Sequence, residues 1–237
     1  MRIRQLGLVV AVLGVTAVWT AMPAGADEPD DTCGSPEQAT VVGTTGTDGP
    51  DIIYGTAGDD VIQAGDGGDF VCGLGGNDMI FGGDGDDFLL GGNGNDVIEG
   101  QGGNDGLVGG DFAGADESNP QPGSKADGND ILRGGNGDDF ATGQTGNDQV
   151  FGGNGNDELF GGPGQTDTVD GGNGDDFVVG TLGPDTLRGG NGDDVLLGDA
   201  FFGDATGGPD SCDGGRGFDV AAGCESETAI EGGATEE

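Results

Sequence analysis

The stretch "GGNGNDVIE", residues 91–99, contains in nine positions the pattern that governs most of this chain. Glycines occupy its first, second and fourth positions, Asp96 is sixth and Ile98 is eighth. The pattern returns with a period of nine, in units that begin at Gly46, Gly55, Ala64, Gly73, Gly82, Gly91, Gly100, Lys125, Gly134, Gly143, Gly152, Gly161, Gly171, Gly180, Gly189, Ala205 and Gly214. The unit at Gly161 has one extra residue. Self-similarity at a fixed short period is the sequence signature of a repeat architecture.

The sixth position is aspartate in all seventeen units. These residues are Asp51, Asp60, Asp69, Asp78, Asp87, Asp96, Asp105, Asp130, Asp139, Asp148, Asp157, Asp167, Asp176, Asp185, Asp194, Asp210 and Asp219. A single Asn-Asp or Asp-Asp pair would be read as a solvated turn. The strict register indicates a common task for the whole column.

The eighth position is apolar in every unit. It is occupied by Ile53, Ile62, Val71, Ile80, Leu89, Ile98, Leu107, Leu132, Ala141, Val150, Leu159, Val169, Val178, Leu187, Leu196, Cys212 and Ala221. Because alternate side chains of a strand face opposite sides, one inward residue per unit fits a three-residue strand at positions seven to nine. The six residues before each strand form a glycine-rich turn, and so many glycines rule out a helix.

The composition limits the partners of the chain. Its 237 residues include 59 Gly, 45 acidic residues, 6 basic residues and no His, for a formal charge of −39. A Gly/Asp-rich chain of this kind is expected to remain disordered unless something other than an apolar core holds it. The two strict columns favour an ordered repeat over a disordered tract. Nucleic acid is excluded because it needs a basic surface, and cations are the natural partners.

The pattern GGxGxDxUx, complete in units such as Gly82–Leu90, Gly91–Glu99 and Gly189–Leu197, resembles the RTX, or haemolysin-type, calcium-binding nonapeptide repeat. The overall layout is similar to that of small secreted calcium-binding repeat proteins of actinobacteria. The resemblance implies an all-β fold, a right-handed parallel β-roll with two units per turn. It also implies that the seventeen aspartates are metal ligands together with turn carbonyls, so that Asp87 works with Asp69 and Asp105.

The residue types agree with calcium independently of the resemblance. Carboxylates and carbonyls are hard oxygen ligands, and calcium tolerates irregular coordination better than magnesium does. Pairs of position-six aspartates two units apart, counted within the two uninterrupted blocks, predict roughly eleven Ca²⁺ sites. Eleven divalent ions would neutralise about half of the excess charge, so the chain is predicted to be largely unfolded without calcium.

Residues 1–26 differ from the rest and predict export. Arg2 and Arg4 are followed by an apolar run and by Ala24-Gly25-Ala26, which is typical of a signal peptide cleaved after Ala26. A retained membrane anchor is the alternative. The predicted division is a signal peptide (1–26), an N-terminal cap segment (27–45), repeat block 1 (46–108), an inserted loop (109–124), repeat block 2 (125–197), and an irregular loop with the last repeats and a C-terminal cap (198–237).

The four cysteines are Cys33, Cys72, Cys212 and Cys224. In an exported chain they predict two disulfides, and three pairings are possible. We favour Cys33 with Cys72 and Cys212 with Cys224, which would staple the two ends of the roll. A thiolate metal site is the alternative, but the sequence has no CxxC pair and no His.

Two stretches interrupt the period, residues 109–124 and 198–204. Each could hide a degenerate unit or serve as a recognition loop. Outward positions seven and nine contain large apolar residues: Phe70 and Phe88 are expected to be neighbours on one sheet, and Phe151 and Phe160 to lie on opposite sheets. They would form a binding face or simply favour strands.

Catalysis is not expected. Without His the chain has no HExxH zinc site and no Ser-His-Asp triad, and GxSxG is also absent. We therefore predict a secreted, calcium-binding β-roll with a structural, cell-surface or matrix role and no membrane insertion. The alternative is a calcium-dependent adhesin or a polysaccharide- or ice-binding module that uses an outward strand face.

Overall fold

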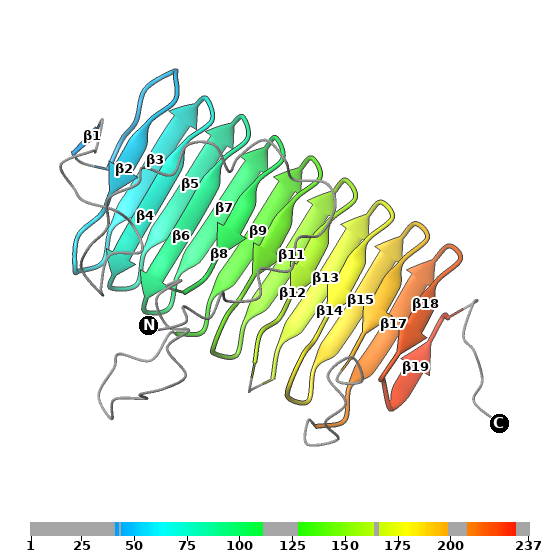
Figure 1. The fold of residues 1–237 in the computed structure, drawn as a ribbon. Helices are drawn as coiled ribbons and strands as arrows, with labels where there is room; N and C mark the ends of the chain where they lie inside the picture. Colours follow the sequence, from blue (N-terminus) through cyan, green and yellow to red (C-terminus); the bar gives the residue numbers. More distant parts are fainter. Residues whose placement is uncertain (1–40, 43, 111–127, 164–165, 199–207, 231–237) are drawn as a thin grey trace, which may run out of the picture.

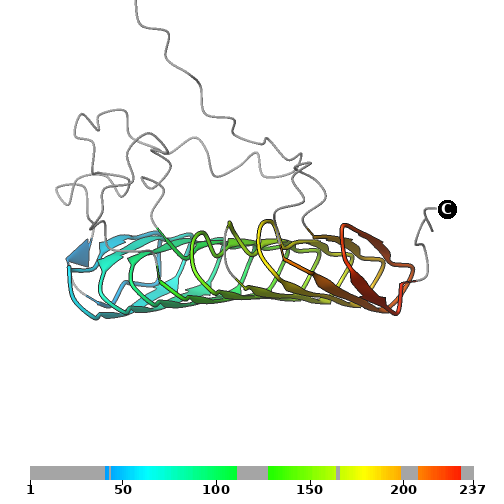
Figure 2. The same ribbon diagram turned by 90° about the horizontal axis from the view of Figure 1, so that it is seen from below.

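The computed structural model describes residues 41–42, 44–110, 128–163, 166–198 and 208–230. This part of the chain is entirely β and contains no helix, hence none long and apolar enough to cross a membrane. The strands form two parallel sheets that face each other in a flat solenoid (Figures 1 and 2). The predicted signal peptide and Cys33 lie outside the described residues.

The strands alternate between the sheets along the chain. The ten-stranded sheet contains β1 (Val41–Val42), β2 (Ile52–Tyr54), β4 (Phe70–Gly75), β6 (Phe88–Asn93), β8 (Gly106–Val108), β10 (Phe140–Thr142), β12 (Glu158–Phe160), β14 (Phe177–Val179), β16 (Val195–Leu197) and β18 (Val220–Ala222). The nine-stranded sheet contains β3 (Val61–Asp66), β5 (Met79–Asp84), β7 (Val97–Gly102), β9 (Ile131–Asn136), β11 (Gln149–Asn154), β13 (Thr168–Asn173), β15 (Thr186–Asn191), β17 (Ser211–Arg216) and β19 (Ser226–Thr228).

The strand register confirms two nonapeptides per turn. Ile53 pairs with Val71 and Ile62 pairs with Ile80, in each case with the residue two units later. Successive units therefore lie on opposite sheets, and each unit stacks on the unit two places away (Figure 1). The predicted all-β roll is confirmed.

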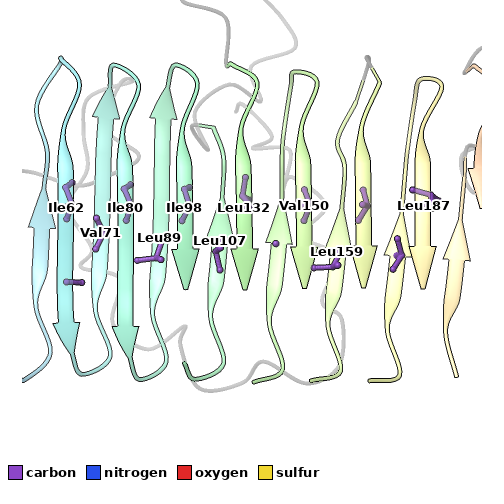
Figure 3. Packing of buried hydrophobic residues seen from close by; sticks show 14 of the residues in the cluster. Ile62, Val71, Ile80, Leu89, Ile98, Leu107, Leu132, Val150, Leu159 and Leu187 are labelled. Carbon is purple, nitrogen blue, oxygen red and sulfur yellow. The ribbon is translucent and has the colours of Figure 1, made fainter. Parts of the chain in front are cut away.

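The interior of the roll is one side chain thick on each sheet. Every position-eight residue from Ile53 to Cys212 is fully buried, and Ala221 packs partly buried at the end. Figure 3 shows 14 residues of this cluster, which come from successive strands along the roll. The predicted apolar column is therefore the core, and it is too thin to stabilise the roll by burial alone.

The turns form two edges. We call edge A the turns that enter the ten-stranded sheet and edge B the turns that enter the nine-stranded sheet. All three irregularities of the repeat fall on edge B: the long interruption between β8 and β9, the extra residue between β12 and β13, and the second interruption between β16 and β17. Edge A is uninterrupted from Gly46 to Asp219. Insertions on one side of a solenoid leave its stacking intact.

The structure changes the starting residue of two units. A Cβ atom built on Gly109 would clash with Asp130 Oδ2, which is the relation that position one has in regular units. Gly109, and not Lys125, is therefore the first residue of the turn that ends at Asp130. Gly198 has the same relation to Asp210, which displaces Ala205. Both interruptions thus begin inside a turn. The sequence could not reveal this, because the start of each unit was assigned by counting five residues back from its aspartate.

The C-terminal end is stapled as predicted. Cys212 and Cys224 form a disulfide beside β19, and Cys224 packs against the end of the core. Cys72 is fully buried on the ten-stranded sheet. Because Cys33 lies outside the described residues, its pairing with Cys72 stays a prediction.

The outer faces of the two sheets differ in chemistry. Phe70 and Phe88 stack on the ten-stranded sheet with ring centroids 5.8 Å apart. Phe151 in β11 and Phe160 in β12 lie on opposite sheets, as expected. The nine-stranded sheet instead presents exposed ion pairs, such as Arg133 with Glu99 at 3.5 Å.

Candidate metal centre

The position-six aspartates form a hydrogen-bonded ladder along each edge. The backbone N–H of Asp69 donates to Oδ1 of Asp87, and the N–H of Asp87 donates to Oδ1 of Asp105, at 2.8 and 2.9 Å. Eleven such pairs lie within the two repeat blocks, and four more cross the interruptions: Asp96–Asp130, Asp105–Asp139, Asp185–Asp210 and Asp194–Asp219. The ladder therefore contains more stacked pairs than the eleven counted from sequence, because the interruptions leave the stacking unbroken.

The second carboxylate oxygen in most turns has no hydrogen-bond donor. In ten turns Oδ2 is buried and accepts no hydrogen bond from the described part of the chain: those of Asp69, Asp78, Asp87, Asp105, Asp139, Asp157, Asp167, Asp176, Asp194 and Asp219. A buried polar atom without a partner costs free energy, and a buried charge costs more. Because Oδ2 lacks a donor in turn after turn, we infer that these oxygens face an electropositive partner that the polypeptide does not supply.

The glycines keep backbone oxygens close to these carboxylates. A Cβ atom built on Gly82, at position one, would clash with Asp87 Oδ2 and lie 2.8 Å from the carbonyl oxygen of Gly100 in the next turn. Position four needs glycine for another reason, since Gly85 has a φ of 127°. A Cβ there would meet the carbonyl oxygen of Gly67 in the previous turn. Side chains are thus excluded from a space lined by oxygen atoms.

Burial changes the protonation of these carboxyl groups in the absence of metal. It raises the pKa of Asp87 to about 7, that of Asp139 to about 8 and that of Asp176 to about 7. The backbone N–H bonded to each carboxylate lowers the pKa, and neighbouring carboxylates of the ladder raise it further. The charged form of these groups is therefore less favoured than in a solvated aspartate, and a nearby cation would restore it.

The donor set suits a hard cation. Carboxylate and carbonyl oxygens line the turns, and the chain has no His. Nowhere in the described residues do three acidic or cysteine side chains converge on one point. An ion in a turn would therefore draw on one or two carboxylates and on backbone carbonyls. Calcium accepts such mixed, irregular oxygen coordination more readily than magnesium.

Two of the seventeen predicted ligands are in a different environment. Oδ2 of Asp51 accepts hydrogen bonds from the backbone N–H and the hydroxyl of Thr47, at 2.6 and 2.9 Å. Oδ2 of Asp60 accepts the same two bonds from Thr56, at 2.6 and 2.8 Å. Asp60 is also only half-buried, whereas the other sixteen are buried.

The structure also reveals a position-six residue that the sequence pattern missed. Glu225 Oε2 accepts the backbone N–H of Asp210 at 2.7 Å, and the N–H of Ser226 donates to the Asp210 carbonyl at 3.1 Å. Glu227 is paired with Cys212, so it stands at position eight. Glu225 therefore ends the edge B ladder in an eighteenth, shortened unit. The only available signal was its place beside Cys224, since the shortened turn removes the nine-residue spacing.

The geometry defines a class of protein: a parallel β-solenoid whose turns are lined by stacked carboxylates and glycine carbonyls, and which takes a hard cation. The RTX calcium-binding nonapeptide repeat is matched in four copies, over residues 45–80, 81–114, 126–159 and 167–202. These copies cover more than half of the chain, and the protein belongs to this calcium-binding repeat family. No curated protein matches the chain significantly.

Proposed function

We propose that the protein is exported, binds several calcium ions in its turns and folds as it binds them, with a structural and non-catalytic role. The ligands are the position-six carboxylates from Asp69 to Asp219, together with turn carbonyls. The predicted signal peptide and the disulfide between Cys212 and Cys224 support an oxidising, extracellular location.

The column of buried, unbonded Oδ2 atoms is the observation that carries this proposal. Except in the turn of Asp69, which begins with Ala64, each of these atoms lies beside a position-one glycine and near a carbonyl oxygen of the next turn, as Asp87 does beside Gly82 and Gly100. The thin core does little to offset repulsion within a chain of formal charge −39. Divalent cations would satisfy the oxygens and reduce the repulsion at once, so binding and folding are coupled.

The test is a calcium titration of the chelated mature chain, residues 27–237, followed by circular dichroism and small-angle scattering. We expect a transition from coil to β structure and a decrease in radius at about 0.1–1 mM calcium, the range of extracellular modules. Magnesium at the same concentration is the control, and it should produce little β structure. A compact, fully ordered chain after exhaustive chelation would contradict the proposal.

A second candidate function is binding of a partner through the outer face of the ten-stranded sheet. Phe160 lies between Phe140 and Phe177, with ring centroids 5.7 and 6.2 Å away. These rings come from β10, β12 and β14, three adjacent strands, and form a continuous aromatic row. The rings are tilted by 46° and 64° to one another, and such an aromatic row on a regular sheet offers apolar contact to the faces of sugar rings.

Binding of the calcium-loaded protein to insoluble polysaccharides tests this function. Replacing Phe140, Phe160 and Phe177 by Thr keeps β-forming residues while removing the rings. We expect this variant to fold with calcium and to lose retention. The matched control is Phe151→Thr on the opposite sheet. Equal retention of both variants would rule out the aromatic row as the binding face.

A further inference from the structure

We propose that Thr47 and Thr56 close the first turn of each edge, so that these two turns take no calcium ion although each contains the position-six aspartate. The inference rests on the proposed function for the other turns. It makes threonine at position two of the first turn on each edge a determinant of metal binding there, and it assigns the two N-terminal turns the role of metal-independent caps.

The hydrogen bonds of the first turn replace what an ion would supply. Thr47 gives Asp51 Oδ2 two donors, its backbone N–H and its hydroxyl, and Thr56 gives the same two to Asp60. In the next turn of each edge, at Asp69 and Asp78, Oδ2 is buried with no donor. An oxygen that already accepts two hydrogen bonds gains less from a cation, because the ion must displace them.

The backbone of the first turns differs as well. At position two, the next turns have a left-handed conformation, with φ of 116° at Gly65 on edge A and 79° at Leu74 on edge B. Neither Thr47 nor Thr56 has a positive φ. Their N–H groups therefore point into their own turn, toward the carboxylate, and the position-two N–H of the next turns makes no such bond.

The threonine hydroxyls also reach the position-four carbonyls. Thr47 Oγ1 lies 3.3 Å from the carbonyl oxygen of Gly49, and Thr56 Oγ1 lies 3.2 Å from that of Gly58. Each hydroxyl thus bridges the carboxylate and a carbonyl, which are two of the oxygen types available to an ion. In the next turns, position two is Gly65 and Leu74, neither of which has a hydroxyl to offer the carboxylate.

Threonine at position two is effective only at the end of the stack. Thr181 is also at position two, but it has a φ of 81° and its buried hydroxyl has no hydrogen-bond partner among the described residues. Its turn lies between two other turns of edge B, whose strands fix its backbone. In the described part of the chain no complete turn precedes the first turns, so their backbone can rotate toward the aspartate.

The inference is tested by counting bound calcium with equilibrium dialysis and native mass spectrometry on the full mature chain. The end variant replaces Asp51 and Asp60 by Asn. The matched variant replaces Asp69 and Asp78, the next residues of the same two ladders, by Asn. We expect the end variant to bind as many ions as the unmodified chain and the matched variant to bind at least two fewer.

A second pair of substitutions tests the role of threonine in the opposite direction. Thr47→Gly with Thr56→Gly restores the usual position-two residue and frees the carboxylates, so the number of bound ions should rise by up to two. The inference is overturned if the end variant loses as many ions as the matched variant, or if the glycine substitutions leave the number unchanged. If neither Asn variant changes the count, the proposed ligands are wrong as well.

Discussion

The backbone N–H of Asp96 donates a 2.7 Å hydrogen bond to Oδ1 of Asp130, although 34 residues separate them in the chain. In a regular turn the same bond spans 18 residues, as between Asp78 and Asp96. The long interruption therefore leaves edge B without altering the stack on either side. The roll is one continuous solenoid and not two blocks joined by a linker.

Deletion of residues 111–126 should therefore preserve the fold. The deletion joins Gly110 to Asp127 and creates the unit "GGDGNDILR", a complete nonapeptide in register with its neighbours. A shorter connection costs less closure entropy, so we expect the free energy of unfolding in calcium to stay equal or to rise by about 1–2 kcal/mol. Chemical denaturation in saturating calcium measures this. A large loss of stability would mean that the interruption packs on the roll.

Removal of a ladder carboxylate should have a much larger effect than removal of its exposed neighbour. We expect Asp87→Ala with Asp96→Ala to raise the calcium concentration at the folding midpoint by about tenfold or more, because each removes a charged ligand. The control replaces Asp86 and Asn95 by Ala as well; both residues stand at position five and are exposed. Calcium titrations followed by circular dichroism compare the two. Equal shifts of the calcium midpoint in the two variants would contradict the assignment of the ligand to position six of the repeat.

The metal-free protein should become less stable as pH rises from about 4 to about 8. Burial raises the pKa of Asp139 to about 8 in the folded state, from 3.8 for an isolated group. The folded state thus keeps protons that the unfolded chain has released, and the stabilisation disappears as pH passes the folded pKa. Circular dichroism in chelator should show more β structure at pH 4.5 than at pH 8.

Calcium binding should depend on pH in the opposite direction. The ion needs deprotonated carboxylates, so binding to metal-free protein that is already folded should release protons between pH 6 and 8 and tighten as pH rises. Unfolded chain has ionised these carboxylates already, so binding coupled to folding should release almost no protons. Calorimetry in buffers of different ionisation enthalpy measures the released protons. Substantial proton release at pH 6.5 would contradict folding on binding, because it would mean that the metal-free chain is already folded, with the raised pKa values of Asp87 and Asp176, both about 7.

Glu225 should stabilise the last turn of edge B. Its carboxylate accepts the N–H of Asp210, and the Cys212–Cys224 disulfide holds it in place. We expect Glu225→Ala to cost about 1 kcal/mol locally and to accelerate hydrogen exchange at the Asp210 amide. Glu227→Ala in β19 is the matched control, because Glu227 is exposed like Glu225 but does not accept the Asp210 N–H. Equal exchange rates at the Asp210 amide in the two variants would show that the Glu225 carboxylate does not protect it, and hence that Glu225 is not part of the ladder.

The sequence by itself determined the period, the two columns and therefore the fold. A strict nine-residue repeat with one apolar residue at position eight can bury that residue only by stacking units, and Ile53 to Cys212 are buried as predicted. The same column arithmetic predicted the oxygen-rich turns, because aspartate recurs at position six without exception.

Tertiary structure alone decided what each aspartate contacts. Asp51 and Asp87 have the same place in the repeat, yet Thr47 bonds the first and the Oδ2 of the second has no donor. Stacking also joined Asp96 to Asp130 and brought Glu225 into the ladder. These contacts depend on which turn lies on either side of a given turn in the stack. The nine-residue period of the sequence does not specify where the stack begins or ends, or at which turn an insertion leaves it.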